Sequence, residues 1–348
     1  MKRYLALLLA GTMAFSAAGC GGSGEELAAS STELNIYMWQ DYISENLIRD
    51  FEEQNGCTVA ITAMPDRETS FEKLQAGCGE EFDLVMTSTK YVAPLIDEEY
   101  VEKINMENVP NSSCIIDKYW LSKSYTIPYL MKYVYVIYDA EKCPVEIDHY
   151  KDLLSEELKG QVAAPDDMDV LFPMALDALG LDPNSVEDED IEKACEWLLK
   201  FRENMSADGA DGAKALLKGT ASAAVTDDRM AAEVMAKNKN IKIAEFTKSK
   251  AQLDTDIFVI PKDAVHKDLA EKFLNYICNP EVMAENLKEF NYACPNDAAV
   301  SLTAKAYREE PSRQFDFKKN IFFRRDISEA QNVYDRCVEI LKTGPIES

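Results

Sequence analysis

Short apolar strands that alternate with amphipathic helices constrain the fold of this chain more than any other feature. "FDLVM" (82–86) is a continuous apolar run, which is typical of a strand covered on both faces. Helical patterns flank it on both sides: "SFEKLQA", which a capping box of Thr69 and Glu72 opens, and "TSTKYVAPLIDEE", which begins with Ser and Thr caps. The same rhythm recurs along most of the chain and predicts an α/β fold with a largely parallel sheet.

The strand–helix units form two series. The first starts at "ELNIYMW", and the chain leaves it near residue 135 within a long strand at 133–138. The second contains "QVAA", "ASAAVT" and "IKIAEF"; "DIFVIP" returns to the first series near 257, and a helix over 328–342 ends the chain. Since the length exceeds one typical domain, we expect two lobes. Their expected boundaries are 33–135 plus 257–300 for lobe 1, and 136–256 plus 301–348 for lobe 2.

The first residues have the features of an export signal. A short basic region, the apolar "YLALLLAGTMAF" and small residues lead to Cys20, which predicts a signal peptide over 1–19. "SAAGC" resembles a bacterial lipobox, although Ala17 stands where Leu is usual. We expect Cys20 to be lipidated and the Gly/Ser-rich segment 20–32 to be a flexible tether that holds the protein at the outer face of the cell membrane. Ordinary signal cleavage, with an unmodified Cys20, is the alternative.

Charge and cysteine content narrow the class of partner. Without the basic pair of the leader, 35 bases face 62 acids, a net charge of about −27, so the surface repels nucleic acid and favours cationic partners. Eight cysteines follow Cys20, none in a CxxC spacing. Disulfides are possible in an exported protein, but the spacing does not decide the matter. Cys195 and Cys337 fall in amphipathic helices, which is typical of buried thiols.

Enzyme signatures are sparse. The sequence holds two histidines, His149 and His266, and no GxSxG, HExxH, Walker or GxGxxG motif. "DPNSVEDEDIEK" lacks the Gly and the final Glu of a calcium loop. We therefore expect a binding protein without catalytic residues, cofactor or metal. A secreted enzyme that uses a thiol with one of the histidines is the alternative from another class.

Acidic and aromatic side chains gather where strands end. "NIYMWQDYIS" (35–44) runs from a strand into Trp39, Asp41 and Tyr42, and Asp167 and Asp227 follow two later strands. Ligands of open α/β sheets bind beyond the carboxyl ends of strands, so these acids could meet in one cleft. Taken alone, a strand-end Trp belongs to a core more often than to a ligand site.

Six segments, in this order and spacing, resemble one family: "YMWQDYI", "FDLVMTSTKYV", "YTIPYL", "LKGQVAAPDDMDVLFPMALDALG", "DIFVIPKDA" and "NYACPNDAA". Over about 33–343 the chain resembles the spermidine/putrescine-binding lipoproteins of bacterial ABC importers. The resemblance implies a monomeric, two-lobed periplasmic-binding-protein type 2 fold with a ligand cleft between the lobes. It also implies delivery of a polyamine to a membrane permease that a cytoplasmic ATPase powers.

The resemblance also implies which residues line the cleft. Those that keep the family's residue type are Trp39, Tyr42, Ser88, Asp167, Asp256 and Tyr292, and Asp41 replaces a Glu. The departures are Lys90 for a Tyr, Val170 for an amine-binding Glu, Asp227 and Asp254 for two Trp, and Arg324 for a Gln.

These departures leave two hypotheses about the ligand. Carboxylates and aromatic faces suit a polyamine, in which case Lys90 and Arg324 would pair with Asp227 or Asp254. Alternatively, Lys90 and Arg324 bind the carboxylate of a zwitterionic or anionic solute, such as an amino-acid-like molecule or an acylated amine. A Lys inside the cleft without any partner would be costly, so one of the two must apply.

Overall fold

The computed structural model describes residues 32–207, 212–310, 321–323 and 331–343. The predicted signal peptide, Cys20, the tether and Arg324 lie outside the described residues. Within the described part, no helix has the length and apolar character needed to cross a membrane.

Strands and helices alternate as predicted. The strands are β1 (Thr32–Met38), β2 (Cys57–Ala63), β3 (Leu84–Ser88), β4 (Val101–Glu102), β5 (Ile127–Asp139), β6 (Val162–Ala163), β7 (Ala223–Asp227), β8 (Ile241–Ile243), β9 (Ala251–Pro261) and β10 (Ile321–Phe323). The helices are α1 (Glu45–Asn55), α2 (Arg67–Gln75), α3 (Val92–Asp97), α4 (Met168–Ala178), α5 (Asp188–Phe201), α6 (Lys214–Lys218), α7 (Asp228–Lys237), α8 (Lys267–Cys278), α9 (Pro280–Glu289), α10 (Asp297–Leu302), α11 (Lys305–Arg308) and α12 (Gln331–Thr343).

The sheet is mixed, so the prediction of a largely parallel sheet is wrong for its centre. The main order is β2-β1-β3-β9-β5-β7-β6. β1 runs parallel to β2 and β3, and β6 runs parallel to β7. However, β9 is antiparallel to β3 and β5, and β5 is antiparallel to β7. A continuous apolar run shows that a strand is covered on both faces but does not show its direction.

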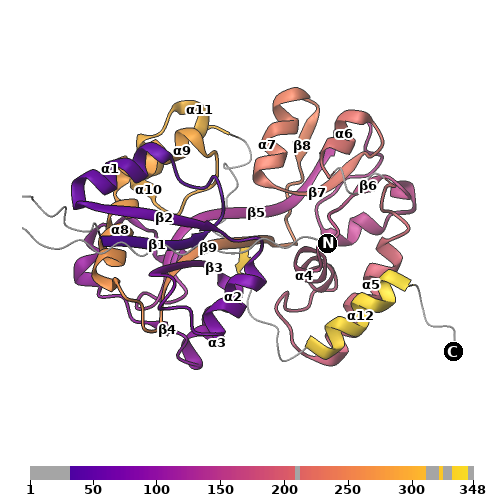
Figure 1. The fold of residues 1–348 in the computed structure, drawn as a ribbon. Coiled ribbons are helices and arrows are strands. Elements are labelled where there is room, and N and C mark those ends of the chain that lie inside the picture. Colours follow the sequence, from indigo (N-terminus) through magenta and orange to yellow (C-terminus); the bar gives the residue numbers. More distant parts are fainter. Residues whose placement is uncertain (1–31, 208–211, 311–320, 324–330, 344–348) are drawn as a thin grey trace, which may run out of the picture.

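β5 and β9 are longer than predicted because each passes from one half of the molecule to the other (Figure 1). On β5, Leu130 packs in the core around β1–β3, whereas Val134 packs in the core around α4 and α5. On β9, Ile257 belongs to the first core and Leu253 to a third cluster beside α6 and α7. These two strands therefore join the halves; the residue boundaries of the lobes stay a prediction.

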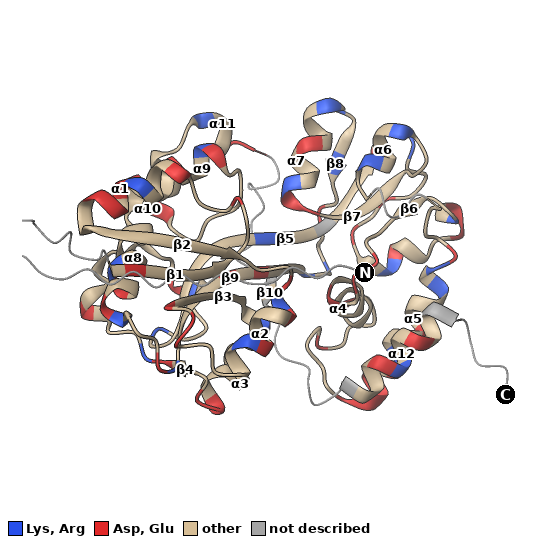
Figure 2. Cartoon of the chain, in the orientation of Figure 1, with Lys and Arg blue, Asp and Glu red and all other residues tan. Residues whose placement is uncertain are grey.

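Aromatic contacts consolidate both halves. In the first, Phe51 and Phe273 meet edge to face with ring centroids 5.1 Å apart. In the second, helix α12 packs against α5, and the buried thiols of Cys195 and Cys337 lie there, as predicted. Figure 2 shows Asp and Glu residues on helices of both halves, so the negative charge is not confined to the cleft.

The start of α2 differs from the prediction. Asp66, and not Thr69, is the N-cap: its carboxylate accepts a hydrogen bond from the Thr69 backbone N–H at 2.7 Å. The helix consequently begins at Arg67, which becomes its first residue. This shift places a cation beside the cleft.

Candidate ligand-binding cleft

The crossing strands form the floor of the cleft. In the register of β5 and β9, Lys132 is opposite Asp254, and Leu130 is opposite Asp256. Ser88 on β3 is the other neighbour of Asp256. Because side chains alternate along a strand, Asp254 and Asp256 point to the same face of the sheet, together with Lys132 from the next strand.

Arg67 joins the two carboxylates of β9. Its Nε and Nη2 donate to Asp256 Oδ1 at 3.0 and 2.8 Å, and its Nη1 lies 2.8 Å from Asp254 Oδ2. The guanidinium carbon lies 5.7 Å from the centroid of the Trp39 ring. A cation thus already occupies the acidic and aromatic part of the cleft.

Tyrosines complete this part of the cleft. The Tyr42 hydroxyl donates to Asp256 Oδ2 at 2.7 Å, and its ring meets the Tyr292 ring edge to face with centroids 4.8 Å apart. The guanidinium carbon of Arg229 lies over the Tyr292 ring, 5.9 Å from its centroid. The Tyr42 backbone carbonyl accepts a hydrogen bond from the Tyr129 hydroxyl at 3.1 Å, which fixes the segment that follows β1.

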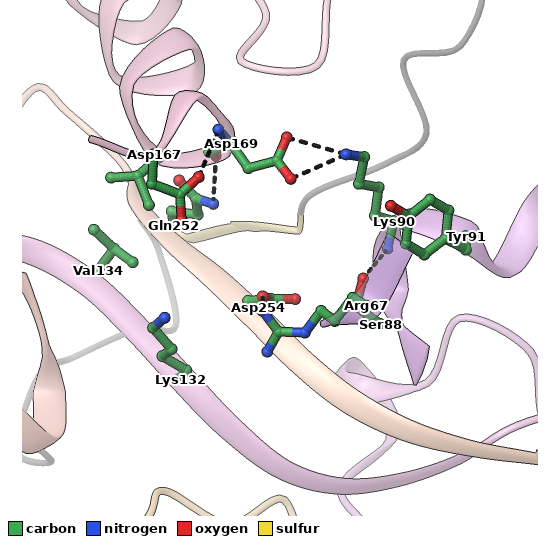
Figure 3. A pocket seen from close by; sticks show the side chains of 11 residues that line it. Arg67, Ser88, Lys90, Tyr91, Lys132, Val134, Asp167, Asp169, Gln252 and Asp254 are labelled. Atoms are coloured by element: carbon green, nitrogen blue, oxygen red, sulfur yellow. Dashed lines mark hydrogen bonds and ion pairs between the residues drawn. The ribbon is translucent and has the colours of Figure 1, made fainter. Parts of the chain in front are cut away.

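The opposite wall comes from α4 in the other half. Asp167 is the N-cap of α4, and its carboxylate accepts from the Asp169 backbone N–H at 2.9 Å. The Asp169 carboxylate accepts from Lys90 Nζ at 2.9 and 3.1 Å, which links the two walls (Figure 3). Gln252 Nε2 donates to the Asp169 backbone carbonyl at 3.0 Å and so ties this wall to the floor.

A cavity of about 50 Å³ lies between these walls (Figure 3). This volume holds a few water molecules and is far below the ~300–1,000 Å³ of a typical ligand pocket. The charged side chains that line it are balanced in number: Arg67, Lys90 and Lys132 against Asp167, Asp169 and Asp254.

Burial shapes the protonation of this cluster. Desolvation lowers the pKa of Arg67, but Asp254 and Asp256 outweigh it and raise the pKa above its ordinary value, so the guanidinium stays charged. Burial also raises the pKa of Asp254, against the opposing effect of Arg67. The pKa of Tyr42 is well above 10.0 because its hydroxyl is buried and next to Asp256, so it remains a hydrogen-bond donor.

The structure brings most of the predicted residues together. Ser88, Lys90, Val170, Asp167 and Asp254 line the cavity, and Arg67 connects Trp39, Asp254 and Asp256. Their role in binding a ligand stays a prediction.

Among the described residues, Asp41 and Asp227 have no hydrogen bond or ion pair with Arg67, Asp254 or Asp256, and one predicted pairing is corrected. Asp227 caps α7 and contributes to the raised pKa of Tyr292, although burial raises that pKa most. Asp41 is exposed, with a φ of 53°, and accepts from Gln40 Nε2 at 3.3 Å. Lys90 pairs with Asp169, whereas the polyamine hypothesis expected Asp227 or Asp254 as its partner.

Six residues that line the cavity were missed: Arg67, Tyr91, Lys132, Val134, Asp169 and Gln252. Lys132 had a visible signal, because it is the single charged residue within the apolar run "YLMKYVYVIY". The indication for Arg67 in the sequence was weaker. Asp66 is as good an N-cap as Thr69, and a helix that starts after Asp66 would have Arg67 as its first residue.

The family comparison agrees with this architecture. A family profile described as "Bacterial extracellular solute-binding protein" matches residues 46–313. The spermidine/putrescine-binding periplasmic protein of Escherichia coli K12 is 26% identical over 97% of this chain and 98% of its own length. The putrescine-binding periplasmic protein PotF of the same strain is 29% identical over 89% of each chain.

Solved structures show the same fold. The structure described as a putative spermidine/putrescine ABC transporter from Listeria monocytogenes superposes with a TM-score of 0.75 at 26% identity, covering 90% of this chain and all of the other. These matches confirm the resemblance and the two-lobed architecture with its cleft. The chain belongs to the bacterial extracellular solute-binding protein family, and it is a non-enzymatic solute-binding protein of an ABC transporter.

Proposed function

We propose that the protein captures an amine of the polyamine class, such as putrescine or spermidine, in the cleft and delivers it to an ABC permease. One observation carries this proposal: the cleft already holds a cation. The Arg67 guanidinium donates to two carboxylates and lies over the indole of Trp39. An ammonium group has the same needs, since a charge-assisted hydrogen bond contributes about 1.5–3 kcal/mol and a ring contact about 0.5–2 kcal/mol.

The relatives support the choice of ligand class, because the names of those with 26–29% identity include putrescine or spermidine. The size of the cavity adds a condition. At about 50 Å³ it does not admit even a four-carbon diamine, so side chains or lobes must rearrange when the ligand enters.

A second candidate is favoured by the other cations of the cleft. Lys90 and Lys132 line the cavity, and among the described residues no hydrogen bond or ion pair reaches the Lys132 ammonium. A zwitterionic solute would offer a carboxylate to Lys132 and an amine to the acids of β9. If the ligand is a zwitterion, Lys132→Met abolishes its binding. If the ligand is a diamine, the same substitution leaves the affinity unchanged or increases it.

Isothermal titration of the protein without residues 1–19 tests the function. Putrescine and spermidine should release or absorb measurable heat, and Asp256→Asn should weaken that binding about tenfold or more, because a charged acceptor is lost. Lys73→Gln is the control for a change of charge, because Lys73 is a half-buried residue of α2 that pairs with the exposed Glu81 and does not line the cavity. If neither amine gives heat or a thermal shift at millimolar concentration, and amino acids do, the zwitterion replaces the polyamine.

The anchoring and the partners belong to the same proposal. We expect Cys20 to carry a lipid that holds the protein at the outer face of the membrane, near a permease and its ATPase. Metabolic labelling with a fatty acid tests this: the natural chain should be labelled and Cys20→Ala should not. Release of the unlabelled variant into the medium would agree, and equal labelling of both chains would contradict the anchor.

A further inference from the structure

We propose that Arg67 is a tethered cation that occupies an amine-binding position of the cleft and controls ligand specificity, because an incoming ammonium group must displace it. This inference deepens the proposed function and rests on it for the identity of the ligand class. It assigns a specificity role to a residue that neither the sequence pattern nor the family resemblance indicates.

The geometry of Arg67 is that of a bound ligand. Its guanidinium has three contacts of 2.8–3.0 Å to two carboxylates, and it lies 5.7 Å from an indole centroid. The carboxylates are on β9, the indole follows β1, and the arginine itself comes from α2. Its side chain is 25% exposed and is one of those that line the cavity.

The neighbours of Arg67 permit its displacement. Asp254 Oδ1 is buried and has no hydrogen-bond partner among the described residues, and Lys132 is opposite Asp254 in the strand register. When Arg67 leaves, Lys132 can therefore compensate the charge of Asp254. Asp256, with the Tyr42 hydroxyl still bound to it, then becomes available to the ligand.

Displacement has a predictable cost. Because Arg67 is attached to the chain, its effective concentration at the carboxylates is millimolar or higher. An amine binds only to those molecules in which Arg67 has left the carboxylates. Its apparent dissociation constant therefore equals the intrinsic constant divided by the fraction of such molecules. If this fraction is about one tenth, removal of the arginine improves the affinity about tenfold.

The first experiment measures affinity by isothermal titration. Arg67→Ala should bind putrescine about tenfold or more tightly than the natural protein, and Lys73→Gln on the same helix should not change the affinity by more than about twofold. A purely structural role of Arg67 predicts the opposite sign, a loss of both stability and affinity. If Arg67→Ala does not fold, the single variant Asp254→Asn is compared with the double variant that carries both Arg67→Ala and Asp254→Asn. The double variant should bind putrescine more tightly than the single variant.

The second experiment uses methylguanidine as a probe of the vacated position. Arg67→Ala should bind methylguanidinium, whereas the natural protein should not. Binding of this probe without any binding of polyamines would support the role of Arg67 and overturn the polyamine function. Equal putrescine affinity of both proteins would overturn the role of Arg67 and leave the function standing, and the absence of binding to any probe would overturn both.

Discussion

The two carboxylates of β9 should respond very differently to neutralisation. Asp256 accepts three hydrogen bonds, two from Arg67 and one from Tyr42, and its side chain is 4% exposed. Asp254 has one ion pair with Arg67, and its Oδ1 is buried without a hydrogen-bond partner among the described residues. Asn in place of either residue preserves the shape and removes the charge.

The expected magnitudes follow from these partners. A hydrogen bond to a charged group contributes about 1.5–3 kcal/mol and a neutral one about 0.5–1.5 kcal/mol, so the Tyr42 contact of Asp256→Asn, which becomes neutral, loses about 1 kcal/mol. The Arg67 contacts keep a charged donor but lose the attraction of the opposite charge, which costs about 1–2 kcal/mol more. The new amide also leaves one donor facing the Tyr42 hydroxyl, and the total destabilisation is about 2–3 kcal/mol. For Asp254→Asn the lost ion pair is offset, because a carboxylate whose pKa burial raises no longer has to be ionised. Its unfolding free energy should change by less than about 1 kcal/mol.

Urea unfolding at neutral pH measures both variants without ligand; guanidinium chloride is unsuitable because it competes with Arg67. The comparison requires an unchanged denaturant dependence, so that a shifted midpoint reports stability alone. Equal destabilisation by the two substitutions, or a larger effect at Asp254, would refute this account of the charge distribution in the cleft.

Three further outcomes can be checked. Lys90→Met should cost less than about 1 kcal/mol in urea unfolding, and less still at high salt, because its partner Asp169 is 43% exposed. Burial raises the pKa of Asp177 above its ordinary value of 3.8, so the protonated carboxyl group stabilises the folded protein at a pH below 3.8. This contribution is lost as the pH rises through the raised pKa, and the stability of the natural protein relative to Asp177→Asn should fall over that interval. Burial raises the pKa of Cys195 and Cys294 to about 12, so a disulfide reagent should modify these thiols slowly in the native protein and rapidly in urea.

The order of strands and helices could be predicted from local patterns. The strands at "ELNIYMW", "FDLVM" and "ASAAVT" appear where apolar runs place them. The direction of the central strands could not be predicted in this way. Strand direction depends on the connections, and a parallel and an antiparallel strand buried on both faces have similar compositions.

The cleft was predictable only in part. Of the strand-end acids that were expected to meet in one cleft, Asp167 caps α4 and lines the cavity, whereas Asp227 caps α7 and is not among the residues that line it. The partner of each charge was not predictable, since Lys90 meets Asp169 across 79 positions and Arg67 meets Asp256 across 189. Such pairings depend on the three-dimensional fold and leave no periodic signal in the sequence.

β5 and β9 serve at once as the connection between the halves and as the floor of the cleft. Any rotation of one half against the other must twist these strands, and the spacing of Lys132 and Asp254 across them changes with the twist. The charges on the floor of the cleft and the angle between the halves therefore depend on the same few residues of β5 and β9. An engineered change of specificity made on these strands will also alter how readily the molecule opens and closes, whereas one made at Arg67 on α2 leaves the joint itself intact.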